Sequence, residues 1–157
     1  MLEYILSFIS YSKHGIHPLT QSDYKDVCEI FKDSFDTEKI PLKNFLAIWE
    51  QREEETCGWF DSYGKLLGFA IIVNHSGKKY LEFLGVYESE RNRGIGSCLL
   101  KYILALESIP SIYLWPISER LKTWYIRNGF YHTSSGYYAF HKYNTRSKKI
   151  CQMCPFT

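Results

Sequence analysis

The sequence predicts an α/β or α+β fold built on a mixed sheet. Two segments with helical apolar spacing come first, a meander of short strands follows, and strands then alternate with helices. A length of 157 residues is about that of one domain. The composition, with 45% hydrophobic and 23% charged residues, excludes a disordered chain, a collagen and a coiled coil. We therefore expect one domain over residues 1–143, followed by a polar and basic tail over 144–157.

The N-terminal third is predicted to hold a strand and two helices. Residues 1–10 are apolar but lack the basic start and the cleavage site of a signal peptide, so a strand is the preferred interpretation. Thr20 stands three residues before Asp23, which is the spacing of a capping box. Helical spacing follows at Tyr24, Val27, Cys28, Phe31 and Phe35. Pro41 suits the first turn of a second helix. The apolar face of that helix would hold Leu42, Phe45, Leu46 and Trp49.

The rest of the domain is predicted to contain a meander and then alternating helices and strands. The meander has strand-like segments at 56–61, 66–73 and 79–87, separated by turns rich in Gly, Ser and Asn. After it we expect a helix over 95–107, a strand over 112–115, a helix over 118–128 and a closing hairpin over 130–141. Ser118 is a good N-cap for the last helix, and Gly129 suits the position after its C-terminus.

The most informative segment covers residues 84–97, where a strand leads through a short loop into a helix. Backbone N–H groups at a helix N-terminus bind anions, and glycine lets phosphate oxygens approach the backbone closely. Two arginines add positive charge at the same place. These features predict a cradle for a pyrophosphate. The cradle would be formed by Arg91, Asn92, Arg93, Gly94, Ile95, Gly96 and Ser97.

Two glycines alone do not distinguish such a cradle from a plain turn before a helix. The segment does not match the G-x-G-x-x-G dinucleotide fingerprint, because residue 99 is Leu. The sequence also contains no G-K-[ST] phosphate loop. The choice between the two interpretations therefore depends on other parts of the sequence.

Three segments together resemble the GNAT N-acetyltransferase superfamily. The R-x-x-G-x-G pattern at residues 91–96 is similar to the family's acetyl-CoA signature, and it follows an apolar strand as that signature does. Residues 124–130 resemble the family's F-Y-x-x-x-G-F segment, and residues 16–23 resemble its opening strand and first helix cap. The resemblance covers residues 16–141 and implies a GNAT-like fold. That fold has a central, strongly twisted mixed sheet of about six to seven strands with helices on both faces.

The resemblance also implies the reaction and the residues that carry it. Acetyl-CoA would donate its acetyl group to a primary amine by direct attack in a ternary complex. Leu84 and Val86 would pair through their backbone with the pantetheine arm, and N–H groups of residues 91–97 would hold the pyrophosphate. Tyr125 would protonate the departing thiolate. Ser118 stands where many members have a cofactor-binding Asn, and it is a further candidate contact.

The sequence leaves the general base open. Attack on a thioester needs a neutral amine, so a proton must leave the ammonium group. Glu82 lies among apolar residues on the strand before the cradle, and it is the candidate catalytic base. It could instead face solvent or pair with a lysine. Tyr80 could organise a water relay, and no base is needed if the amine is already partly deprotonated.

The acceptor is open as well, and either a small molecule or a protein could supply the amine. Trp59, Tyr63, Tyr137 and Tyr138 could line an acceptor pocket or simply pack. The acidic run at 53–55 could attract a cationic acceptor or form a solvated charge cluster. One alternative function is an acyltransferase that uses another acyl-CoA or a hydroxyl acceptor. The other is a CoA-binding sensor or interaction module without turnover. The proton donor expected at Tyr125 argues against this second alternative, because a protein that only binds CoA does not need an acid there.

Charge, hydropathy and the cysteines indicate which partners and which cellular compartment to expect. A net charge of +2 is too small for a dedicated nucleic-acid binder, and no apolar run approaches the ~18 residues of a membrane span. The five cysteines are expected to be reduced thiols in the cytoplasm, with Cys98 packed in the core. No metal site is expected, because the histidines lack ligand spacing and the pair Cys151 and Cys154 lacks two further ligands. A monomer or a homodimer is expected.

Overall fold

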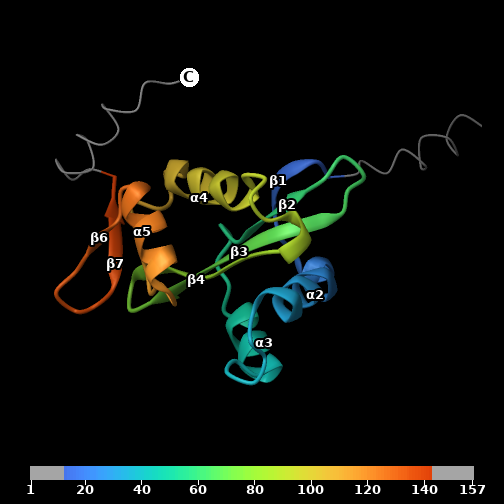
Figure 1. The fold of residues 1–157 in the computed structure, drawn as a ribbon, viewed down its shortest axis with the longest axis horizontal. Helices are drawn as coiled ribbons and strands as arrows, with labels where there is room; N and C mark the ends of the chain where they lie inside the picture. The colour runs from blue at the N-terminus through green and yellow to red at the C-terminus, as the bar shows by residue number, and fades with distance from the viewer. Residues whose placement is uncertain (1–12, 143–157) are drawn as a thin grey trace, which may run out of the picture.

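The computed structural model describes residues 13–142, and the strand predicted over 1–10 and the Cys151–Cys154 pair lie outside the described residues. Seven strands form one sheet in the order β1-β2-β3-β4-β5-β7-β6 (Figure 1). All neighbouring strands are antiparallel except β4 and β5, which are parallel. The strands are β1 Gly15–Pro18, β2 Cys57–Phe60, β3 Leu66–His75, β4 Lys78–Val86, β5 Ser111–Leu114, β6 Tyr131–His132 and β7 Tyr138–His141. The prediction of a mixed sheet with six to seven strands is confirmed.

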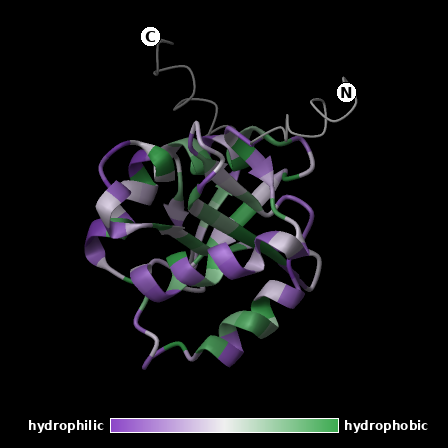
Figure 2. Cartoon of the chain, turned by 90° about the vertical axis from the view of Figure 1, so that its right-hand side faces the viewer, coloured by the Kyte–Doolittle hydropathy of each residue, from purple (hydrophilic) through white to green (hydrophobic). Residues whose placement is uncertain are grey.

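Helices cover both faces of this sheet, as predicted. In the view of Figure 1, α4 (Ile95–Ala105) lies above the sheet, whereas α2 (Tyr24–Ser34) and α3 (Leu42–Glu50) lie below it. Helix α5 (Glu119–Arg127) packs in the same core as α4. Figure 2 shows hydrophobic residues concentrated in the central strands and hydrophilic residues on the outer sides of the helices. No helix within residues 13–142 is both long enough and apolar enough to cross a lipid bilayer.

Each face of the sheet has its own core. The core under α4 and α5 is mainly aliphatic and draws residues from β2 to β5 and from β7. The core under α2 and α3 is largely aromatic, and the rings of Phe31 and Phe45 stack there with centroids 4.0 Å apart. Among the described residues, this second core includes none from β5, β6 or β7. Helices α2 and α3 therefore cover only one half of their face of the sheet.

Local capping chemistry sets where the helices begin. Thr20 donates its N–H to Asp23 Oδ2 at 2.8 Å, which completes the predicted capping box. That box starts the short 3-10 helix η1 (Gln21–Asp23), which leads directly into α2. Pro41 immediately precedes the first residue of α3. Ser118 Oγ accepts the N–H of Leu121 at 3.2 Å, so the predicted N-cap of α5 is confirmed.

Several expectations about individual side chains are wrong. Cys98 is exposed, because it lies one position, or about 100° of helix rotation, before the buried Leu99. The acidic run at 53–55 is not a solvated cluster, since Glu55 is buried. Both oxygens of the Glu55 carboxylate accept hydrogen bonds from Lys79 Nζ, at 3.0 and 3.1 Å. Lys79 Nζ also lies 3.7 Å from Glu53 Oε2, so two of the three acidic side chains share one lysine, which balances one of their two negative charges.

Helix α3 provides a direct test of the packing described above. The sequence places Leu42 on the apolar face of this helix, but its side chain is 37% exposed in the structure, whereas Phe45 is fully buried. We expect Phe45→Ala to lower the free energy of unfolding by about 3–5 kcal/mol, because it removes a ring from the aromatic core. Leu42→Ala should change the free energy of unfolding by less than about 0.5 kcal/mol. Urea denaturation of both variants checks this, and equal losses would contradict the observed packing.

Candidate active site

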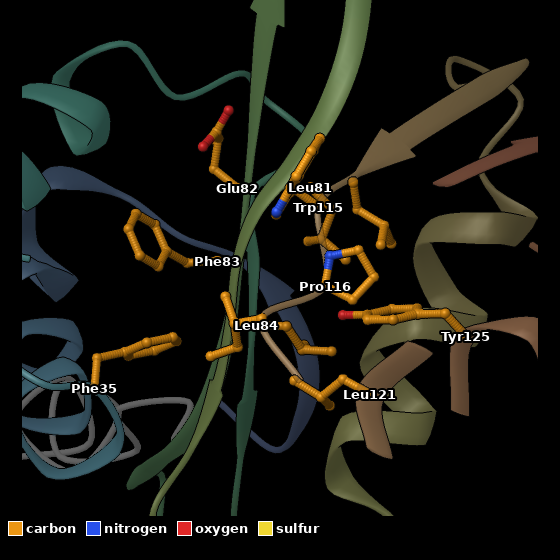
Figure 3. A pocket seen from close by; sticks show the side chains of 11 residues that line it. Phe35, Leu81, Glu82, Phe83, Leu84, Trp115, Pro116, Leu121 and Tyr125 are labelled. Carbon is orange, nitrogen blue, oxygen red and sulfur yellow. The ribbon is translucent and has the colours of Figure 1, made fainter. Parts of the chain in front are cut away.

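The two parallel strands in the middle of the sheet separate soon after they meet. Strands β4 and β5 share one register pair, Tyr80 with Tyr113. Beyond it the strands diverge, and the side chains between them line an open cavity of about 60 Å³ (Figure 3). The walls of the cavity come from the end of α2, from β4, from residues 114–117 and from α5. We call this cavity the slot.

A β-bulge in β4 lies beside the slot. Ile71 of β3 pairs with Phe83, and the next residue, Ile72, pairs with Leu81. Glu82 is therefore the extra residue, with no partner across the ladder. As a result Leu81 and Phe83 point into opposite cores, although residues two apart on a regular strand share a face. The bulge changes the direction of β4 at the place where β5 leaves it.

The edge of β4 that faces the slot carries unpaired backbone groups. Tyr87 donates its N–H to a carbonyl of β3 at 3.1 Å, so the alternating residues Leu84 and Val86 direct their N–H and C=O groups away from β3. The Val86 carbonyl already accepts hydrogen bonds from Ser34 Oγ at 2.8 Å and from Arg91 Nε at 3.3 Å. Both groups of Leu84 and the N–H of Val86 are thus the groups available to an extended ligand.

The loop before α4 and the first turn of that helix have the geometry of the predicted anion cradle. The first hydrogen bond of α4 runs from the N–H of Cys98 to the carbonyl of Gly94, at 2.9 Å. Within residues 13–142, none of the N–H groups of residues 92–97 donates to a protein acceptor. The N–H of Arg91, which the sequence analysis included in the cradle, donates instead to the carbonyl of Glu88 at 3.3 Å. Gly94 has a φ of 84°, and a Cβ atom there would meet nothing within 4 Å. A Cβ atom on Gly96 would meet only Val86, at 3.9 Å, so both glycines face open space.

The two arginines beside the cradle are exposed, and each has a partner within the chain. Arg93 Nη1 lies 2.5 Å from Glu90 Oε2, and Arg91 bonds to a backbone carbonyl of β4. Glu90 is the last residue of the 3-10 helix η2 (Glu88–Glu90), which precedes the loop. Exposed ion pairs of this kind are weak, so an anionic ligand can compete for Arg93. Part of the charge predicted for the cradle is therefore balanced in the structure as it stands.

Tyr125 is buried on α5 and lines the slot. In Figure 3 its hydroxyl points into the slot, toward Pro116 and β4. The ring is held in edge-to-face contacts by Trp124 and Phe130, with centroids 4.9 and 5.3 Å away. Burial raises the pKa of the Tyr125 phenol above its ordinary value, so the group keeps its proton throughout the neutral range. Its phenol therefore has a proton that it can donate to a group bound in the slot.

Glu82 lies on the opposite side of β4 from Tyr125, and its carboxylate points away from that residue (Figure 3). Glu82 Oε1 is 3.1 Å from Nε2 of His75, which stands at the end of β3. The partner is thus a histidine and not the lysine that the sequence left open. The Tyr80 ring packs against the His75 ring with centroids 5.3 Å apart, so both candidates for proton transfer contact His75.

Sequence reasoning treated His75 as one of several scattered histidines and missed this contact. A usable signal was the tight turn at Ser76 and Gly77, which places His75 opposite Lys78 and starts the register of the hairpin. The bulge at Glu82, further along β4, then brings its carboxylate within hydrogen-bonding distance of His75. No sequence pattern reveals that bulge.

The other predicted site residues are not brought together as a group. Ser118 is exposed, and its Oγ already accepts the capping hydrogen bond of α5. Tyr63 is 91% exposed in a turn, Tyr138 is buried in the core under α4 and α5, and Trp59 packs beside His14. Of the four aromatic residues predicted to line an acceptor pocket, only Tyr137 approaches the slot, through its contact with Trp115.

Comparison with known proteins identifies the family. A family model described as "Acetyltransferase (GNAT) domain" matches residues 49–132, which is more than half of the chain, and the chain belongs to this family. No curated protein matches. Membership makes the chain an acyltransferase of the GNAT type, with acetyl-CoA as its donor substrate. The open cradle and the unpaired edge of β4 fit a ligand with a pyrophosphate and an extended amide-bearing arm.

Solved structures share this fold at low sequence identity. A structure described as histone acetyltransferase HPA2 and related acetyltransferase, from Corynebacterium glutamicum, is 21% identical with a TM-score of 0.67, covering 83% of this chain and 98% of that chain. The ribosomal-protein-S18-alanine N-acetyltransferase of Escherichia coli is 19% identical with a TM-score of 0.63, covering 80% and 92%. The PaiA N-acetyltransferase of Thermoplasma acidophilum, in complex with coenzyme A, is 18% identical with a TM-score of 0.61, covering 80% and 97%.

The cradle can be tested by closing it with a side chain. We expect Gly96→Val to weaken CoA binding by at least about tenfold, because the branched side chain would stand in front of the free N–H groups. The fold should survive, since the new Cβ atom has only one neighbour, at 3.9 Å. Gly94→Val is the poorer choice, because a φ of 84° strains any β-branched residue.

The matched control for this experiment is Cys98→Val in the same turn of α4. The N–H of Cys98 already donates to the carbonyl of Gly94, so it is not one of the free N–H groups of the cradle. Titration calorimetry with CoA should show normal affinity for Cys98→Val and weakened affinity for Gly96→Val. Equal affinity in both variants, with melting temperatures near the parent's, would remove the cradle from this loop.

Proposed function

We propose that the chain is an N-acetyltransferase that transfers the acetyl group of acetyl-CoA to a primary amine by direct attack in a ternary complex. The observation that carries this proposal is the protonated phenol of Tyr125, which points into the slot that β4 and β5 leave between them. A module that only binds CoA has no use for a buried proton donor at that position. Family membership and the free N–H groups of the cradle support the choice of donor.

The donor is held along β4 and over the start of α4. The backbone groups of Leu84 and the N–H of Val86 pair with the pantetheine arm, since these groups face away from β3. The N–H groups of residues 92–97 hold the pyrophosphate, and Arg91 and Arg93 contribute charge beside it. Ser118 Oγ accepts a hydrogen bond from its own helix, so its O–H remains the group that it offers to the donor.

Tyr125 acts as the general acid. An N–C bond forms to the acetyl carbon, the C–S bond breaks, and the sulfur leaves with the electron pair and receives the phenol proton. An ammonium group loses two protons in becoming an amide, so one of these regenerates Tyr125 and the other goes to solvent. Burial keeps the pKa of the phenol high, so the proton is present at the start of each cycle.

Glu82 acts as the general base, together with its partner His75. The carboxylate stands on the bulge of β4, at the edge of the slot, and it is half-buried. A carboxylate held by a histidine can accept the ammonium proton and pass it to solvent through the exposed imidazole. Tyr80, which packs on the same imidazole, helps to fix the orientation of that ring.

The setting and assembly that the sequence suggests are part of the same proposal. Cys28, Cys57 and Cys98 are free thiols in the structure, which suits a reducing compartment such as the cytoplasm. Burial raises the pKa of Cys57 to about 12, so that thiol is unreactive at neutral pH. A monomer or a homodimer, with an amine of a small molecule or a protein as acceptor, completes the proposal.

Replacing the acid tests the mechanism most directly. Tyr125→Phe keeps the ring contacts but removes the proton, so we expect kcat to fall by about 10²–10⁴. The KM for acetyl-CoA should change little, because the cradle is intact. Tyr63→Phe, at an exposed turn, is the control and should keep the parent rate. Steady-state kinetics decide the matter, and a kcat of Tyr125→Phe within about twofold of the parent would defeat the acid role.

The raised pKa of Tyr125 determines how kcat should depend on pH on the alkaline side. A phenol whose pKa lies above 10 in the folded protein keeps its proton as pH rises through the neutral and mildly alkaline range. We therefore expect no alkaline loss of kcat below about pH 10 from this group. A kcat profile measured from pH 6 to 10 checks this. A fall centred near pH 8 that disappears in Tyr125→Phe would contradict the burial effect.

Replacing the base should give a different pH signature. We expect Glu82→Gln to lower kcat about 10²-fold or more at neutral pH and to recover at alkaline pH, where the amine loses its proton without help. Glu54→Gln, an exposed acidic residue outside the slot, is the matched control and should follow the parent profile. The pH–rate profiles of the three proteins separate the roles. A Glu82→Gln profile parallel to the parent's, with an undiminished rate, would show that Glu82 is structural.

A further inference from the structure

Four aromatic rings, which we call the aromatic face, lie on the α2 and α3 side of the sheet and extend from the edge of the aromatic core into the half that these helices leave uncovered. They are Tyr80 on β4, Tyr113 on β5, Trp115 just beyond β5, and Tyr137 just before β7. The rings contact one another in series, with centroids 5.5 Å apart for Tyr80 and Tyr113, 5.5 Å for Tyr80 and Tyr137, and 5.2 Å for Trp115 and Tyr137. Trp115 is 61% exposed, so the face is open to solvent at that end.

The aromatic face connects the two ends of the proposed chemistry. At one end Trp115 lines the slot together with Tyr125, the proposed acid. At the other end Tyr80 packs against His75, which bonds to Glu82, the proposed base. A molecule whose amino group lies near Glu82 and the slot would therefore rest the remainder of its body on these rings.

The charged groups around the aromatic face are few, and most of them already have a partner within the chain. Glu82 is the one acidic residue of β4, and Glu119 is the one acidic residue between 111 and 142. Glu119 lies on α5 and pairs with Lys122 at 2.6 Å. Lys79 is held by Glu53 and Glu55, as described above. The other groups are His75, His141, whose ring lies 5.8 Å from that of Tyr113, and Lys78, whose Nζ lies 5.2 Å from the centre of that same ring.

These observations point to a class of acceptor. We infer that the acceptor is a small amine with a single positive charge, in which a short chain joins the amino group to an aromatic or other flat apolar group. The inference rests on the proposed function and narrows its substrate. Aromatic rings bind flat apolar groups and attract an ammonium, as Lys78 on Tyr113 already shows within the chain. One carboxylate, Glu82, matches one positive charge.

The same features disfavour the other acceptors. A polyamine would bring further ammonium groups next to Lys78. Among strands β4, β5, β6 and β7, Glu82 is the one carboxylate that could balance their charge. A peptide would bring amide groups that need hydrogen-bond partners. Strand β7 pairs with β5 along one edge and with β6 along the other, so its backbone offers few such partners.

The first experiment compares acceptors under saturating acetyl-CoA. The acceptors are 2-phenylethylamine, propylamine, spermidine and a tripeptide with a free N-terminal methionine. We expect kcat/KM for 2-phenylethylamine to exceed each of the others by about tenfold or more. If spermidine or the peptide matches or exceeds 2-phenylethylamine, the inference is overturned while the proposed function stands.

A binding measurement separates failure of the inference from failure of the proposed function. Quenching of tryptophan fluorescence by 2-phenylethylamine and by spermidine is measured on the protein saturated with CoA. Preferential binding of 2-phenylethylamine without any acetylation would support the inference and overturn the proposed function. Absence of any preference for 2-phenylethylamine would overturn the inference, whether or not turnover is observed.

Two variants test the residues named. Tyr137→Ala should raise the KM for 2-phenylethylamine about tenfold and leave the KM for acetyl-CoA unchanged, with Tyr63→Ala as the matched control at an exposed tyrosine. Lys78→Glu keeps every ring and adds a second carboxylate, so it should raise kcat/KM for spermidine at least about fivefold. Unchanged acceptor kinetics in both variants, with folding confirmed by circular dichroism, would show that the acceptor binds elsewhere.

Discussion

The separation of β4 and β5 is the constraint on which the rest of the structure depends. The two strands share one register pair, and beyond it their facing backbone groups have no partner in the sheet. A sheet tolerates such a gap only if another group can occupy it, because unpaired polar backbone groups are costly when buried. The bulge at Glu82, the unpaired edge at Leu84 and the inward position of Tyr125 all lie around this gap. The proposed sites of donor binding and proton transfer therefore both lie at one departure from regular pairing.

The sequence predicts those features that depend on local chemistry. The capping box of Thr20, the N-cap of Ser118 and the glycines of the cradle act within a few residues of themselves, so their patterns are legible without the fold. The order of the elements and the position of Tyr125 follow from motifs at fixed spacing. The structure adds that Tyr125 is buried and that it lines the slot between β4 and β5.

Features that depend on contacts across the sheet escape the sequence. The pairing of Glu82 with His75 requires a bulge that no residue pattern marks, and Lys79 reaches Glu55 from a different strand. The aromatic face is likewise a product of topology, because its rings come from β4, the end of β5 and the start of β7. The outward position of Cys98 shows the same limit within a single helix, since a shift of one residue moves a side chain from core to solvent.

The two cores extend over different parts of the sheet, and only one of them spans the gap between β4 and β5. The aromatic core under α2 and α3 stops at β4, whereas the aliphatic core under α4 and α5 joins Ala70 and Leu81 to Ile112 and Tyr138 across it. That layer of side chains acts as a brace, which sets the opening angle in place of backbone hydrogen bonds. Leu99 and Ile103 belong to this brace although neither lines the slot, so the packing that spans the gap is separate from the residues that face the cavity. The aromatic core reaches only one side of the gap, where Phe83 and Phe35 line the slot.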